Sequence, residues 1–154
     1  MTRTTGMGLF VGLLMTLALL GQASAQTCPR DAAAELDAAV AQTLAAVQSG
    51  DATALLAVVS DDGLAFNPEG EEVGYRALQT QFTNKSGRFC ALFTCNGQRG
   101  ALGAKFHRGP IDKQIDSRNG LATVFVNANT NDELQLNYRL RNCRWELTGV
   151  AMVE

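Results

Sequence analysis

The sequence predicts an α+β domain in which N-terminal helices pack on a curved antiparallel sheet. Apolar residues recur every three or four positions over residues 36–47, which is the period of a helix, and every second position over residues 134–141, which is the period of a strand. Helical segments come first and strands follow, an order typical of helices packed on an antiparallel sheet. With 154 residues, 46% of them hydrophobic, we expect a single core.

Residues 1–25 have the pattern of a secretory signal peptide. Arg3 precedes an apolar run over residues 7–20, and small side chains follow at residues 23–25, as at a cleavage site. The alternative is an uncleaved membrane anchor, but the run is shorter than the roughly 20 residues that cross a bilayer. We therefore expect a single mature domain over residues 26–154 that is periplasmic or secreted and has no membrane attachment.

Four cysteines lie in the mature part, and in an exported small domain they predict two disulfides. They are Cys28, Cys90, Cys95 and Cys143. Three pairings are open, of which we favour Cys90 with Cys95 and Cys28 with Cys143, the second tying the start of the domain to its last strand. A zinc site is not expected, because this spacing is not that of a zinc knuckle. No phosphate-binding or dinucleotide-binding motif is present either, so no cofactor is expected.

Helices are expected in the first half of the mature chain. Pro29 suits a helix start, acidic residues follow in the first turns, and Gly50 ends the apolar period. Asp51 can cap a second, shorter helix that ends before residue 61. A short strand, a turn and a third helix are then predicted at residues 64–66, 67–70 and 75–82.

From residue 88 onward the apolar period changes to that of strands. Residues 88–94 alternate weakly, and the glycine-rich residues 96–103 are expected to form a loop. Asn119 and Gly120 predict a hairpin turn, because this pair tolerates the positive φ of tight hairpins. Trp145 is expected to face the core. Strands are predicted at residues 105–107, 113–117, 121–128, 134–141 and 144–153.

This order of elements resembles the nuclear transport factor 2-like (NTF2-like) superfamily of SnoaL-like and cystatin-like cones. The resemblance is carried by the break at Gly50 and Asp51, the turn at residues 61–63 and the closing run over residues 145–150. It implies a pocket between sheet and helices, which members use for acid–base catalysis, for small ligands or for no chemistry, and it implies pairing into a homodimer through the outer sheet face. The cysteines and the glycine-rich stretch are two features in which this sequence differs from many members of the superfamily. A cystatin-like single helix on a sheet is the alternative.

Candidate catalytic residues are few. His107 is the single histidine and could act as a general base, although no carboxylate lies at a fixed spacing from it. Tyr138 is in phase with the apolar residues of its strand, so its ring is expected to face inward and its hydroxyl could line a pocket. Asp112 and Asp116 share a strand face and could pair as acid and base, or form a solvated edge.

Acidic and basic residues are concentrated in different regions of the chain. Residues 26–72 hold one base against nine acids, and residues 76–118 hold eight bases against two acids. A surface of one sign can attract an oppositely charged partner, or the two regions can neutralise each other within the fold. Nucleic acid is not expected as a partner of an acidic, exported protein. The residues expected to bind a protein partner are Arg88, Arg99, Lys105, Arg108 and Lys113.

These observations favour a non-catalytic module that binds a protein partner in the periplasm, for example an immunity-type inhibitor of a secreted toxin. Two alternatives stay open. One is a small-molecule-binding protein that uses the cone pocket, and the other is an acid–base enzyme of the lyase, isomerase or hydrolase type.

Overall fold

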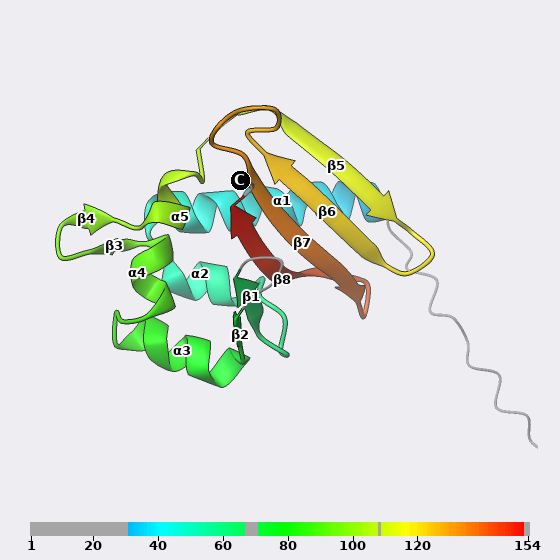
Figure 1. Cartoon of the computed structure of the whole chain (residues 1–154). Coiled ribbons are helices and arrows are strands. Elements are labelled where there is room, and N and C mark those ends of the chain that lie inside the picture. Colours follow the sequence, from blue (N-terminus) through cyan, green and yellow to red (C-terminus); the bar gives the residue numbers. More distant parts are fainter. Residues whose placement is uncertain (1–30, 67–70, 108, 153–154) are drawn as a thin grey trace, which may run out of the picture.

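The computed structural model describes residues 31–66, 71–107 and 109–152. The region expected to be a signal peptide lies outside these ranges. Within them the chain forms helices that lie on one face of a twisted sheet, as Figure 1 shows. The fold class predicted from the sequence is confirmed.

The helices precede the long strands. The longest, α1, crosses the sheet, and the shorter helices lie around the first strands (Figure 1). They are α1 (Ala32–Ser49), α2 (Ala52–Leu56), α3 (Tyr75–Thr83), α4 (Arg88–Leu92) and α5 (Ala101–Ala104). None of the helices in the described ranges has both the length and the hydropathy needed to span a bilayer.

The main sheet has six strands in the order β2-β1-β8-β7-β6-β5. Neighbouring strands are antiparallel except β1 and β8, which are parallel, so β8 joins the first strands to the later ones. The strands are β1 (Leu64–Phe66), β2 (Glu71–Val73), β5 (Ile111–Asp116), β6 (Leu121–Val126), β7 (Leu134–Arg141) and β8 (Arg144–Met152). The hairpin predicted at residues 118–120 joins β5 to β6.

Asp31 and Trp145 fix the start of α1. The Asp31 carboxylate accepts a hydrogen bond from the backbone N–H of Ala33 at 3.0 Å, as the N-cap of a helix does. The indole N–H of Trp145 donates to the carbonyl of Ala32 at 2.8 Å. Because Trp145 lies on β8, this bond fastens the first turn of α1 to the sheet, and the prediction that Trp145 faces the core is confirmed.

The strand period predicted from residue 88 onward is wrong for residues 88–92, which form helix α4. Phe89 and Phe93 are spaced as on a helix, and both are buried. Their rings meet that of Phe82, with centroids 6.1 Å and 5.5 Å from it. Burial of this aromatic cluster outweighs the weak alternation seen in the sequence.

The loop predicted over residues 96–103 is also wrong. Asn96 and Gly97 both have positive φ (51° and 76°) and make the tight turn of a small hairpin of β3 (Thr94–Cys95) and β4 (Gln98–Arg99). Helix α5 follows directly. The strand predicted over residues 105–107 is absent from this part of the structure, because Phe106 turns into the core and is 1% exposed.

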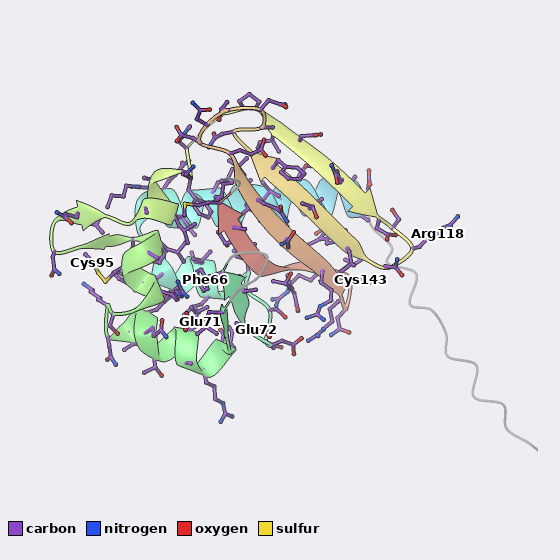
Figure 2. All side chains as sticks on the ribbon, viewed as in Figure 1. Phe66, Glu71, Glu72, Cys95, Arg118 and Cys143 are labelled. Carbon is purple, nitrogen blue, oxygen red and sulfur yellow. A yellow bond between two sulfur atoms is a disulfide. The ribbon has the colours of Figure 1, made fainter. Side chains whose placement is uncertain are left out.

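The disulfide predicted between Cys90 and Cys95 is confirmed and joins α4 to the small hairpin. Cys143 is also disulfide-bonded and lies at the turn between β7 and β8, away from Cys95 in Figure 2. Cys28, its predicted partner, lies outside the described residues.

Candidate functional site

The inner face of the sheet and helix α1 meet in a filled interior. The side chains at this contact are 0% to 3% exposed. Those from α1 are Leu36, Val40, Thr43 and Val47, and those from the sheet are Val124, Leu136, Tyr138 and Leu147. The space between α1 and the middle of the sheet is therefore filled by the protein's own side chains.

Tyr138 faces inward, as the alternation predicted, and its hydroxyl donates a hydrogen bond to Thr43 Oγ1 at 3.0 Å. Thr43 in turn donates to the carbonyl of Ala39 at 2.9 Å. Burial raises the pKa of the Tyr138 phenol, against the smaller opposing effect of the bond to Thr43, so the group stays neutral. Both hydroxyls thus serve to satisfy buried polar atoms.

His107 lies at the surface, between α5 and β5, with its side chain half exposed. Its Nε2 is 3.6 Å from Asp132 Oδ2, and Lys105 Nζ is 4.0 Å from the other oxygen of the same carboxylate. The structure therefore places His107 on the outside and Tyr138 in the core, and it does not bring the two candidate catalytic residues together.

Asp112 and Asp116 both lie on the outer face of β5, opposite Phe125 and Leu121 of β6. Asp116 accepts hydrogen bonds from the backbone N–H groups of Arg118 and Asn119, which stabilise the hairpin turn. The hydrogen bond from the Asn119 side chain, followed by these backbone bonds, lowers the pKa of Asp116. The Asp116 carboxylate therefore stabilises the turn between β5 and β6.

The residues expected to bind a partner are spread over several elements. Arg88 pairs with Glu71 and stacks over the ring of Phe66 at 4.7 Å, and Lys113 pairs with Asp37 of α1. Lys105 donates to the carbonyl of Asn131 and Arg99 to that of Gly103. Arg108 lies outside the described residues. The pairs of Arg88 and Lys113 show that the acidic and basic regions partly neutralise each other.

A second group of charges lies on the outer face of the sheet. Arg139 and Arg141 donate to the same oxygen of Asp62, at 2.6 Å and 2.7 Å, and so fasten the turn before β1 to β7. The hydrogen bond and charge of Arg141, followed by those of Arg139, lower the pKa of Asp62. Beside them Arg144 reaches the buried carboxylate of Glu146 at 3.4 Å. The sequence offered no signal for the contacts of Asp62, because Arg139 and Arg141 lie far from it along the chain.

Replacing Asp62 with asparagine is expected to destabilise the protein near neutral pH but not in strong acid. A carboxylate whose pKa is lower in the folded state contributes stability above the unfolded pKa of about 3.9 and loses it as pH falls through the folded pKa. Urea unfolding of wild type and Asp62→Asn between neutral and strongly acidic pH measures the difference. Asp61→Asn, which removes the same charge one residue away, should cost less, and an equal cost would contradict the role of the two arginines.

Strand β5 forms one edge of the sheet, and all six of its residues are exposed. Ile111 and Ile115 lie on its inner side and are 45% and 38% exposed. Two hollows border it. One, of about 360 Å³, lies between the start of β5 and α1 and is lined by Ala41, Leu44, Ala45, Gln48, Gly109 and Ile111. The other, of about 340 Å³, is open and is lined by residues 114–116 and 121–123.

The strand predicted over residues 113–117 overlaps β5, but its start and its place at the edge of the sheet were not predicted. Residues 111–115 alternate between isoleucine or lysine and polar residues, but Gly109 and Pro110 directly before them hid the start of the strand. Elsewhere, within the described ranges, no group of three or more histidine, cysteine or acidic residues is placed to hold a metal ion.

Comparison with known proteins shows similarity of structure. The chain is similar to an NTF2-like protein from Cytophaga hutchinsonii, with 14% identity and a TM-score of 0.49, over 79% of this chain and 97% of that one. A second similar structure is an NTF2-like protein with a cystatin-like fold from Novosphingobium aromaticivorans, with 18% identity and a TM-score of 0.45, over 79% and 82% of the two chains.

The fold resembles that of NTF2-like proteins, as the sequence pattern predicted. No family model matches the sequence. No curated protein matches it either. A third structure, a protein of unknown function with a cystatin-like fold from Nostoc punctiforme, is 17% identical with a TM-score of 0.45, over 78% of this chain and 88% of that one. The NTF2-like likeness concerns the fold alone.

Proposed function

We propose that this chain is an exported, non-catalytic module that binds a protein partner, for example an inhibitor that protects its own cell from a secreted toxin. The observation that carries the proposal is the filled interior. The inner face of the sheet closes on α1 with side chains at most 3% exposed, and the hydroxyls of Tyr138 and Thr43 already bond within the protein. The chain therefore binds its partner through its surface.

Three further features support the proposal. His107, Tyr138, Asp112 and Asp116 are not gathered in one site, as general acid–base catalysis would need. The signal-peptide pattern of residues 1–25 and the Cys90–Cys95 disulfide suit an oxidising compartment. The exposed edge of β5, with two half-exposed isoleucines, offers a surface that another protein can cover.

The proposal is tested with the mature chain, residues 26–154, immobilised and exposed to a periplasmic extract of the source organism. We expect one protein to co-purify in a fixed ratio and, once isolated, to raise the melting temperature of the chain. A parallel thermal scan with a library of metabolites is the counter-test. If no protein is retained and a metabolite raises the melting temperature, the chain binds a small molecule and the proposal fails.

A further inference from the structure

The two edges of the sheet differ. At one edge β2 has three residues, two of them glutamates, and Val73 is buried. At the other edge β5 has six residues, all exposed. Alternate residues of an edge strand direct their N–H and C=O groups away from the sheet, and among the described strands none pairs with this side of β5. The β5 edge is therefore long enough to accept another strand.

The side chains of β5 are sorted by face. Ile111 and Ile115 lie on the inner side, and Ile111 lines the hollow against α1. Asp112 and Asp116 lie on the outer side. Lys113, on the inner side between the isoleucines, is held by Asp37. An added strand would thus meet apolar groups on one face and carboxylates on the other.

A second copy of the chain fits this edge poorly. Residues that face each other across antiparallel strands share a sheet face, so a symmetric pair has two registers that engage most of β5. One register places Lys113 opposite Lys113 of the second copy, and the other places Asp112 opposite Asp116 twice. Like charges directly opposite each other are destabilising. These charges disfavour edge-to-edge pairing of the chain with itself, and they leave a homodimer through the outer sheet face unaffected.

We infer that β5 binds an extended segment of the partner by strand addition, and that this segment alternates apolar residues with lysine or arginine. The inference rests on the proposed function. Basic side chains of the segment lie opposite Asp112 and Asp116, and its apolar side chains cover Ile111 and Ile115. The backbone of the segment bonds to the outward N–H and C=O groups of β5, and the hollow beside α1 receives an apolar side chain.

The test uses the mature chain and synthetic peptides with the core Lys-Val-Gln-Thr-Lys-Val, compared with the same peptide carrying glutamate in place of both lysines. We expect the basic peptide to bind at least about tenfold more tightly, and less tightly as salt is added. Amide chemical shifts and slowed hydrogen exchange should map its site to residues 111–116. Equal binding of the two peptides, or changes confined to other elements, would overturn the inference.

Two N-methylated forms of the basic peptide separate strand addition from simple charge attraction. Each form is methylated on one of the two alternate sets of amides, so that in one form the methyl groups face β5 and in the other they face solvent. We expect one form to lose binding and the other to keep it. If both forms bind, or both fail to, the backbone of the peptide does not pair with β5 and the inference is wrong.

Charge reversal in the protein gives the matched control. Asp112→Lys should weaken the basic peptide about tenfold and favour the acidic one, whereas Glu72→Lys, which changes the net charge equally at the other edge, should change binding less than about twofold. The same variants separate this inference from the proposed function. A natural partner that Asp112→Lys still retains would refute strand addition and leave the proposed function standing, whereas a wild-type chain that retains no partner refutes the proposed function.

Discussion

Replacing Tyr138 with alanine is expected to cost about 3–5 kcal/mol of unfolding free energy, the range found for removal of a large buried side chain. Tyr138 is 1% exposed and lies where β7 faces α1. The substitution removes its packed ring and its hydrogen bond to Thr43 at 3.0 Å. Urea unfolding monitored by the fluorescence of Trp145, the single tryptophan, measures the loss.

Two control variants separate the parts of this effect. Tyr138→Phe keeps the ring and loses the hydroxyl, so about 1 kcal/mol is expected. Leu121→Ala removes an apolar side chain that is 47% exposed on the same sheet, and it should change stability by less than about 0.5 kcal/mol.

The alanine variant also tests the filled interior directly. The space left by the ring is apolar on most sides, and a cavity of this kind can bind a small apolar molecule such as benzene. We expect benzene to raise the melting temperature of Tyr138→Ala and not that of wild type. If wild type responds equally, the interior already holds an open pocket, which contradicts the filled interior on which the proposed function rests.

Replacing Gly63 with alanine is expected to cost roughly 3 kcal/mol or more, because strain and collision act together. Gly63 has φ of +120°, a conformation that side chains rarely adopt, and an added Cβ would lie 2.2 Å from the carbonyl oxygen of Val73. That oxygen belongs to β2, which pairs with β1 directly after Gly63. The variant should unfold at lower urea concentration, with the largest changes of amide exchange in β1 and β2.

Gly50→Ala is the matched control for Gly63→Ala. Gly50 also has positive φ, 76°, at the end of α1, but an added Cβ would meet no atom within 4 Å. It therefore carries the conformational strain without the collision, and about 1 kcal/mol is expected. Equal losses for the two variants would show that the contact with β2 relaxes and that backbone strain alone accounts for the effect.

The sequence predicts an element correctly where the spacing of its apolar residues matches the face that is buried in the folded chain. Residues 134–141 alternate strictly because one face of β7 packs on α1 and the other faces out. Residues 88–94 misled because Phe89 and Phe93, four residues apart, fit both a weak alternation and a helical spacing, and only contact with Phe82 decides between them. Asn96 and Gly97 carried a hairpin signal that their glycine-rich surroundings obscured.

The site depends on contacts that no short segment of sequence contains. Lys113 meets Asp37, and Arg139 and Arg141 meet Asp62, over separations of 76, 77 and 79 residues. The division of charge along the chain predicted that opposite charges could meet, but not which ones. The exposed edge depends on the strand order, which places β5 outermost and β8 in the middle.

The central place of β8 also governs how the sheet can assemble. Within the sheet, β1 and β2 are paired to the β5–β6–β7 meander through β8, with Ala65 beside Gly149 and Leu136 opposite Val150. Residues 144–152 follow every other described strand along the chain, so the strand pairing of the main sheet cannot be completed before they are made. Pairings over such long separations form slowly. A chain truncated before residue 144 therefore cannot form the six-stranded sheet and is expected to stay unfolded.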